Sequence, residues 1–229
     1  MQLVCYMKAA VVTGANRGIG LELTKQLLDS NFKVHATYRS SLGGLEDIQN
    51  QSLFTHRLDV RDNDAVTSLA NSIEGSIDLL INNAGIADGR WQSISEIDME
   101  YALEVLHVNS IAPVLVTQKL LSKLNNDSTV VMMSSLMGSI SDCKSGRSYA
   151  YRASKTALNM FSIAMKNELD TVGISLLIMH PGWVETDMGG PNALLSTKES
   201  VSGIMQRINE QDMSLSGRYV EFDGTPVEW

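Results

Sequence analysis

The sequence contains very little cysteine: Cys5 and Cys143 are the only two in 229 residues. Their separation matches no metal-ligand spacing, and so few thiols are typical of a reduced protein without disulfides. The four histidines form no HExxH-like pair. We therefore expect a cytoplasmic protein with no disulfide and no catalytic metal.

Long apolar runs are also missing. No stretch approaches the 18 or more residues of a membrane-spanning helix, which predicts a chain without a membrane span. The N-terminus lacks the charged start and small-residue cleavage site of a signal peptide. We interpret residues 1–6 as a short extension, because Met7 and Lys8 would make a natural start to a first strand.

Positive charge is in deficit: the formal net charge is −8, and no basic block interrupts the acidic balance. This argues against nucleic acid as a partner, because nothing would offset the repulsion of its phosphates. The 44% hydrophobic and 19% charged content is that of an ordinary globular protein. Length alone would allow one large α/β domain or two small ones.

Apolar strand-like runs alternate with helical patterns from end to end, with no linker and no internal repeat. Alternation of this kind predicts a single α/β domain over residues 1–229, built as a doubly wound parallel sheet of about seven strands with helices on both faces. The expected strands lie at 9–13, 33–38, 53–58, 77–81, 129–134, 174–180 and 217–222. The expected helices run from Ile19 to a stop at Asn31, from a cap at Asp62 to Ile73, and over 96–124, 148–169 and 198–209, with Pro113 kinking or breaking the third.

A glycine-rich turn joins the first strand to the first helix. In a βαβ unit the bare amides and the helix N-terminus at such a turn favour a pyrophosphate, as in Rossmann-type domains. Gly14 would permit the sharp turn, Gly18 would let phosphates approach, and Gly20 would let helix and strand pack closely. The candidate cofactor-binding residues here are Gly14, Asn16, Arg17, Gly18, Ile19 and Gly20.

The second strand ends without the acidic residue that usually holds the ribose of NAD. Arg39, together with Arg17, would instead suit a 2′-phosphate, so we expect NADP(H) to be preferred, with NAD(H) possible. The alternative is that both are solvated surface arginines. Asp59, next to Val60, could accept from an adenine amino group, or it could cap a turn.

Tyr151 and Lys155 lie four residues apart in a predicted helix and therefore share one face. A neighbouring ammonium favours the phenolate and would lower the pKa of the phenol from its ordinary value of about 10. A Tyr-x-x-x-Lys spacing found without other motifs is more often a surface tyrosine beside a surface lysine. The other motifs of the chain decide between a catalytic pair and a surface pair.

Taken together, the motifs resemble those of the short-chain dehydrogenase/reductase family over essentially the whole chain from Met7. The stretches 150–155 and 180–191 are most similar to its C-factor and sniffer-like carbonyl reductase branch. The matching pieces, in chain order, are Thr13-Gly14-x-x-x-Gly18-x-Gly20, Asn82-Asn83-Ala84-Gly85, Asn109, Ser135, Tyr151-x-x-x-Lys155 and Pro181-Gly182-x-x-x-Thr186.

This resemblance implies a set of roles. Tyr151 would donate the proton to a carbonyl oxygen, Lys155 would hold the nicotinamide ribose, and Ser135 would polarise the carbonyl. Ser135 is preferred over Ser134 because the second serine of such a pair is usually the catalytic one. Asn109 would position a water that links Lys155 to solvent. The remaining implied cofactor contacts are Asn83, Ala84, Gly85, Pro181, Gly182, Val184 and Thr186.

The implied activity is NADPH-dependent reduction of an aldehyde or ketone. The alternatives are a nucleotide-binding signalling protein with little turnover and an NAD-dependent alcohol dehydrogenase. The segment between Ser135 and Tyr151 is longer than in many relatives, which leaves the pocket shape open. Trp91, Met137, Trp183 and Met188 would line an apolar substrate pocket, or would only pack the loops.

Two further expectations concern the helix predicted over 148–169. Tyr149 lacks a lysine four residues on and is assigned to the core or the substrate pocket. The helix also carries more apolar residues than one sheet face requires, so we expect a homodimer or homotetramer. The residues behind this expectation are Leu158, Phe161, Ile163, Met165 and Leu169.

Overall fold

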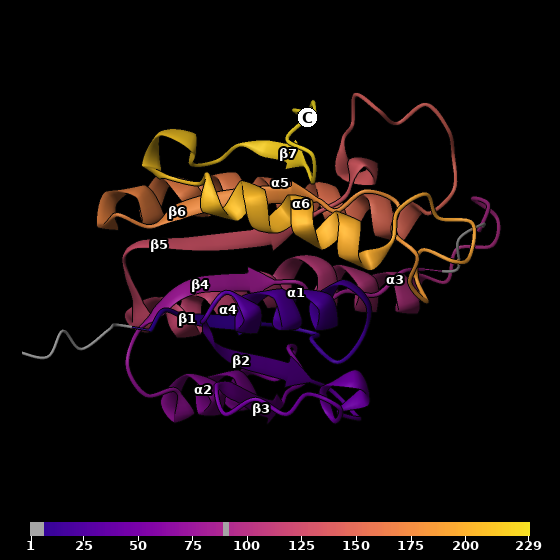
Figure 1. Cartoon of the computed structure of the whole chain (residues 1–229). Coiled ribbons are helices and arrows are strands. Elements are labelled where there is room, and N and C mark those ends of the chain that lie inside the picture. The colour runs from indigo at the N-terminus through magenta and orange to yellow at the C-terminus, as the bar shows by residue number, and fades with distance from the viewer. Residues whose placement is uncertain (1–6, 89–91) are drawn as a thin grey trace, which may run out of the picture.

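The computed structural model describes residues 7–88 and 92–229, so the proposed extension at 1–6 lies outside the described residues. Strands and helices alternate as the sequence predicts (Figure 1). The strands are β1 Ala9–Val12, β2 Lys33–Tyr38, β3 Leu53–Arg57, β4 Ile77–Asn82, β5 Leu124–Met133, β6 Ser175–His180 and β7 Tyr219–Glu221. The α-helices are α1 Gly18–Asp29, α2 Asn63–Ser72, α3 Met99–Leu106, α4 Ala112–Leu120, α5 Tyr149–Leu169 and α6 Thr197–Asn209.

The seven strands of the described residues all run parallel, in one sheet of order β3-β2-β1-β4-β5-β6-β7. The chain starts in the middle, winds outward through β2 and β3, and then returns to place β4 on the other side of β1. The point where the order reverses lies between β1 and β4, and ligands of doubly wound sheets bind at the carboxyl ends of strands there. The predicted fold class is confirmed.

Each central strand sends alternate side chains to opposite faces of the sheet. Val11, Leu80 and Val130 point into one apolar layer with α2, α4 and α5, while Val12, Ile81 and Val131 point into a second layer with α1 and α6. In Figure 1, α1 and α6 lie side by side over the near face of the sheet. Because both faces are covered, the strands are nearly continuous apolar runs.

Several helix boundaries follow from local chemistry. Asn31 adopts a left-handed conformation (φ 60°) directly after α1, as expected for a helix stop. The Asp62 carboxylate accepts from the amides of Asp64 (2.9 Å) and Ala65 (3.0 Å) and so caps α2. Both predictions are confirmed.

The long helix predicted over 96–124 is interrupted next to Pro113, as predicted, but its outer bounds are wrong. α3 ends at Leu106, a π-helical turn occupies His107–Ile111, α4 begins at Ala112, and a short 3₁₀ turn covers Leu121–Lys123. Pro113 lies in the first turn of α4, where its missing N–H is not needed. The fifth strand also begins at Leu124 rather than at 129, because Leu124 already pairs with Ile77.

The apolar residues expected on the surface of α5 are mostly internal. Leu158 and Leu169 are only 1% and 5% exposed because they belong to the core layer under the sheet. Ile163 and Met165 are half-buried against the same layer, and Phe161 alone is 40% exposed. Tyr149 is exposed, so its assignment to the core is wrong, and it does not line the cleft described below.

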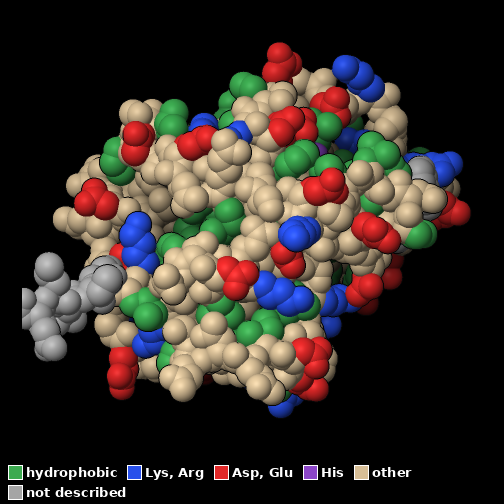
Figure 2. Space-filling model, viewed as in Figure 1, with side chains coloured by type: hydrophobic (Ala, Val, Ile, Leu, Met, Phe, Trp, Pro, Cys, Tyr) green, Lys and Arg blue, Asp and Glu red, His purple; other side chains and the backbone are tan. Residues whose placement is uncertain are grey.

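In the parts of the chain that the structure describes, no helix is both long enough and apolar enough to cross a membrane. Acidic and basic side chains are interspersed over the face drawn in Figure 2.

Candidate active site

The glycine turn has the geometry that the sequence predicts. Gly14 (φ 64°) and Gly18 (φ 53°) both occupy the left-handed region that favours glycine. A Cβ on Gly20 would lie 2.3 Å from the Gly14 carbonyl oxygen, so α1 could not pack this closely on the turn with any other residue. No side chain caps the N-terminus of α1, so its backbone amides can bind a pyrophosphate.

The end of β4 is tied to this turn by hydrogen bonds. Asn83 Nδ2 donates to the carbonyls of Thr13 (2.9 Å) and Gly14 (3.1 Å). The Thr13 hydroxyl in turn accepts from the amides of Asn83 and Ala84, each at 3.0 Å. The side chain of Asn83 therefore supports the turn, and this network fixes the cleft wall at the point where the strand order reverses.

The carboxyl ends of the strands open into a cleft of about 730 Å³. Its lining runs from the glycine turn to α5, as a dinucleotide site requires. Most of the predicted cofactor residues line it: Gly14, Asn16, Arg17, Gly18, Ile19, Gly20, Arg39, Asp59, Val60, Asn83, Ala84, Gly85, Tyr151, Lys155, Pro181 and Thr186. Four predicted residues, Asn109, Ser135, Gly182 and Val184, do not line it.

Arg17 is paired within the protein, which the sequence did not reveal. Its guanidinium donates to the carboxylate of Asp187, in the loop after β6, and both side chains are largely exposed. Arg39 is exposed at the end of β2 and also lines the cleft. A bound phosphate would therefore compete with Asp187 for Arg17.

Asp59 caps a turn, the second of its two predicted roles. Its carboxylate accepts from the backbone amide of Arg61 (3.0 Å) and from the Arg61 guanidinium at 2.6 and 3.0 Å. These hydrogen bonds lower the pKa of Asp59 to about 2, against a smaller effect of burial. The residue still lines the cleft beside Val60.

Tyr151 and Lys155 lie one turn apart on α5, and both face the cleft. Lys155 Nζ is 5.7 Å from the centre of the Tyr151 ring and donates to the Met133 carbonyl at 2.7 Å. Burial lowers the pKa of Lys155 to about 8. A buried ammonium that faces a tyrosine in a cleft is unusual for a structural lysine, so the surface-pair interpretation is wrong for Lys155.

Asn109 lies in the π-helical turn and is completely buried. Its amide brackets the backbone of Ile86, accepting from the amide (2.9 Å) and donating to the carbonyl (2.8 Å), and it donates to the Ser154 hydroxyl (3.0 Å). A Cβ on Gly85 would lie 3.3 Å from Asn109 Oδ1 and 3.8 Å from Lys155 Nζ. Asn109 therefore joins the loop after β4 to α5 directly behind the cleft.

Ser134 and Ser135 differ in what their hydroxyls do. Ser134 Oγ donates to Asn159 Oδ1 at 2.6 Å, so its proton is committed inside the protein. Ser135 Oγ accepts from the Met137 amide at 3.2 Å, and a hydroxyl that accepts still has its own proton to donate. Ser134 contributes to the cleft wall and Ser135 does not, yet the hydrogen bonds favour Ser135 as the donor to a substrate.

The loop after β6 closes the other side of the cleft. Thr186 Oγ1 accepts from the Gly189 amide at 2.9 Å, and Thr186 lies against Gly18 of the glycine turn. Gly182 is left-handed (φ 82°), and an added Cβ there would lie 2.4 Å from Leu195. Gly182 and the buried Val184 therefore shape this loop from behind.

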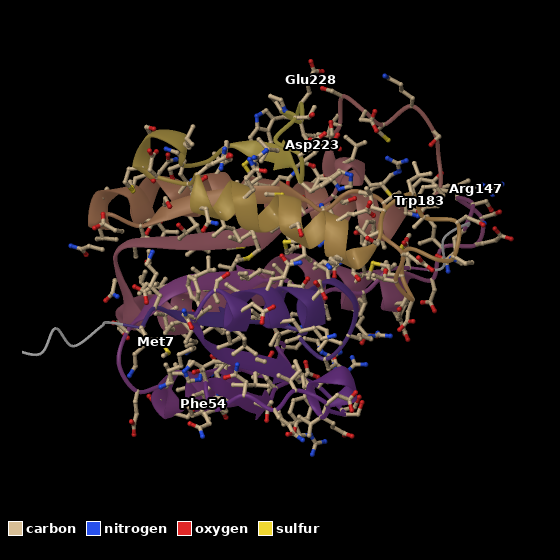
Figure 3. All side chains as sticks on the ribbon, in the orientation of Figure 1. Met7, Phe54, Arg147, Trp183, Asp223 and Glu228 are labelled. Atoms are coloured by element: carbon tan, nitrogen blue, oxygen red, sulfur yellow. The ribbon has the colours of Figure 1, made fainter. Side chains whose placement is uncertain are left out.

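The predicted apolar pocket is present only in part. Met188 lines the cleft, whereas Trp183 and Met137 do not, and Trp91 lies outside the described residues. Trp183 Nε1 donates to the Gly189 carbonyl at 2.8 Å and so packs its own loop. Trp183 lies at the edge of the sheet where the strands end (Figure 3).

Three contributing residues escaped the sequence analysis. Asp88 Oδ2 accepts from the Ala150 amide at 3.0 Å and thereby caps the helix that carries Tyr151. Asn159 Oδ1 accepts a hydrogen bond from the Ser134 hydroxyl, and the Tyr219 hydroxyl donates to the Ser135 carbonyl. Only Asn159 left a signal, because it lies four residues beyond Lys155 on the same helical face.

Comparison with known proteins gives the family directly. The sequence model of the family described as short chain dehydrogenase matches residues 8–194. The chain therefore belongs to the short-chain dehydrogenase family of oxidoreductases.

Its relatives include enzymes and a protein named for signalling. C-signal of Myxococcus xanthus is 38% identical over 161 residues, which cover 69% of this chain and 96% of that protein. The carbonyl reductase Sniffer of D. melanogaster superposes with a TM-score of 0.92 at 31% identity, covering 98% of this chain and 100% of that one. An NADPH-bound carbonyl reductase from chicken fatty liver superposes with a TM-score of 0.91 at 32% identity, covering 97% and 99%.

Proposed function

We propose that the protein is an NADPH-dependent reductase of aldehydes or ketones. The observation that carries this proposal is the buried Lys155 next to Tyr151 in the dinucleotide cleft. The two solved carbonyl reductases share the fold over nearly the whole chain, which supports the same reaction class.

The residues of the chain divide the work of the reaction. When bound, the nicotinamide supplies the hydride. Tyr151 donates the proton to the carbonyl oxygen, and the Lys155 ammonium beside it favours loss of that proton and holds the ribose hydroxyls. Ser135 donates a hydrogen bond that fixes and polarises the same carbonyl oxygen. Thr186 binds the carboxamide of the nicotinamide.

Asn109 acts through the backbone that it holds. Its amide groups are engaged with Ile86 and Ser154, so its side chain fixes the loop after β4 beside Lys155. In this proposal the π-helical turn around Asn109 positions the water that connects Lys155 to solvent, since π-turns occur frequently at functional sites.

NADP(H) is the proposed cofactor. Arg39 and Arg17 both line the cleft and could bind a 2′-phosphate, and no acidic residue stands at the end of β2 to hold the ribose of NAD. The chicken reductase is described as NADPH-bound, which favours the same choice here. The substrate is a small apolar carbonyl compound, because Met188 supplies an adaptable apolar wall.

The proposal includes self-association in the cytoplasm. The neighbouring helices α3 and α5 leave Leu103 (68% exposed) and Met160 (71% exposed) uncovered, together with Met99, Phe161 and, in the π-helical turn, Ile111. This surface replaces the one expected from the sequence, and a second copy of the chain would cover it.

A cofactor and substrate panel tests the proposal. NADPH or NADH is mixed with aliphatic and aromatic ketones, aldehydes and a charged keto acid, and cofactor oxidation is followed by absorbance. We expect turnover with NADPH and an apolar carbonyl. Tight NADPH binding without turnover on any carbonyl would favour the signalling alternative, and faster turnover with NADH and an alcohol–ketone pair would favour the alcohol dehydrogenase.

A further inference from the structure

Ser135 and Tyr151 come from different elements, so the reaction proposed above depends on the contacts that fix the position of Ser135 relative to Tyr151. Ser135 follows β5, whereas Tyr151 is on α5. Directly beneath Ser135 lies a buried group of polar side chains from three elements, namely Ser134, Asn159 and Tyr219. None of them has a role in the proton or hydride transfer. This inference rests on the proposed function.

Tyr219 reaches the serine from β7. It is 4% exposed, and its hydroxyl donates to the Ser135 backbone carbonyl. Burial raises the pKa of Tyr219, so the hydroxyl keeps its proton and remains a donor. The Trp229 ring packs on it with centroids 5.3 Å apart, and the Trp229 carbonyl accepts from the Ser141 amide at 2.9 Å. Trp229 thus holds both Tyr219 and the loop that leaves Ser135.

Asn159 links the same strand end to the catalytic helix. Its Oδ1 accepts a hydrogen bond from the Ser134 hydroxyl, and its Nδ2 donates to the Gly138 carbonyl at 3.3 Å. The Thr156 hydroxyl donates to that carbonyl as well, at 2.9 Å. Gly138 packs so closely on α5 that an added Cβ would lie 2.9 Å from the Lys155 carbonyl carbon.

Tyr151, Lys155 and Asn159 lie at four-residue spacing and form one stripe along α5. The helix face that presents the proton donor therefore also holds the backbone on both sides of Ser135. We infer that Tyr219, Ser134 and Asn159 form a buried polar brace that positions Ser135 against Tyr151. They are positioning residues, since they act through Ser135 and α5, although Ser134 also contributes to the cleft wall.

Such a brace matters because the rate of a reaction depends strongly on the distance between the reacting groups. A displacement of about 1 Å between reacting groups lowers a rate by about a hundredfold. Each buried hydrogen bond in the brace restricts the motion of the backbone around Ser135. A buried polar network in which every group is hydrogen-bonded favours a single conformation of that backbone. The brace should therefore affect kcat more than the binding of substrate or cofactor.

The test uses Tyr219→Phe, which removes one hydroxyl and keeps the ring that packs on Trp229. We expect kcat to fall by about tenfold or more, while KM and the NADPH Kd stay within twofold. Hydrogen–deuterium exchange of the backbone at 134–138 should become faster. Ser134→Ala, which removes the hydroxyl that donates to Asn159, should have the same signature, and the two changes combined should be less than additive because they act as one unit.

Ser175→Ala is the matched control. It removes a buried hydroxyl that lies 3.1 Å from Thr129 Oγ1, at the opposite end of the same pair of strands. The stability of Ser175→Ala should fall by about as much as that of Tyr219→Phe and Ser134→Ala. Its kcat per folded molecule and its hydrogen–deuterium exchange at 134–138 should stay at the wild-type level. Unchanged kcat and exchange in folded Tyr219→Phe and Ser134→Ala would overturn the brace. A wild-type protein that reduces no carbonyl would instead contradict the proposed function, and exchange would still decide whether the brace exists.

Discussion

The ammonium of Lys155 is buried, and burial disfavours the charged form. Burial lowers its pKa to about 8 from an ordinary 10.5, and the ammonium donates to the uncharged Met133 carbonyl. Below about pH 8 both the folded and the unfolded chain carry the proton, and the folded chain bears the full penalty of burying it. Between about pH 8 and 10.5 the folded chain has lost a proton that the unfolded chain keeps, so stability rises with pH.

Lys155→Met should therefore be stabilising relative to wild type, most strongly at pH 7 and less as the pH rises to 10. The depression of the pKa corresponds to at most about 3 kcal/mol at 1.36 kcal/mol per pH unit. Thermal unfolding at pH 7, 8.5 and 10 measures it. Lys123→Met is the control, since Lys123 also donates to a backbone carbonyl (Ile73, 3.0 Å). A stability difference that does not change with pH would contradict burial of the charge as its cause.

The ion pair between Arg17 and Asp187 makes a second prediction at this scale. Asp187→Asn should tighten NADPH binding by up to about fivefold, because exposed ion pairs contribute about 0.2–1 kcal/mol and Asp187 competes with the phosphate. NADH binding should change much less, and the gain should fade in high salt. Titration of both cofactors into Asp187→Asn and wild type is the measurement. Equal gains for NADPH and NADH would show that Arg17 does not contact the 2′-phosphate.

Arg39→Asp should reverse the cofactor preference towards NADH. The same titration of both cofactors measures it.

Among the elements, α5 depends on a cap from outside its own sequence. Asp88 accepts from the Ala150 amide, and removal of such a cap costs about 0.5–2 kcal/mol. Asp88→Ala should lower the melting temperature and reduce turnover, because Tyr151 lies in the first turn of α5, while Asp88→Asn keeps an acceptor and should lose less. Asp62→Ala removes the equivalent cap of α2 and should lower stability alone. Equal turnover in Asp88→Ala and Asp62→Ala would refute this role.

The elements themselves were largely predictable, because apolar runs, glycine positions and caps are local signals. The predicted second strand and the stop at Asn31 agree with the structure, and the Gly14 and Gly18 conformations were evident from the motif. Pro113 marked the break within 96–124 to about one turn, but the π-helical turn itself and the early start of β5 have no local signature; the latter depends on pairing with Ile77. The partners of Arg17 and Ser135 lie far away along the chain, so only the folded structure reveals them.

At the scale of the whole molecule, the uncovered apolar surface of α3 and α5 predicts assembly. Light scattering at micromolar concentration should give about two or four times the 25.0 kDa of one chain. Leu103→Lys combined with Met160→Lys should shift the mass to one chain without unfolding it, because both side chains are exposed. A wild-type mass of a single chain would contradict the assembly.

The proposed reaction depends above all on Tyr151 as the proton donor in the cleft. Tyr151→Phe removes only a hydroxyl and should leave the fold and NADPH binding intact. General acid catalysis contributes about 10² to 10⁴-fold, so turnover of the best carbonyl substrate should fall by at least a hundredfold. The decisive measurement is NADPH oxidation by Tyr151→Phe and wild type at equal cofactor saturation. A variant that binds NADPH normally and turns over at a near-normal rate would contradict the mechanism.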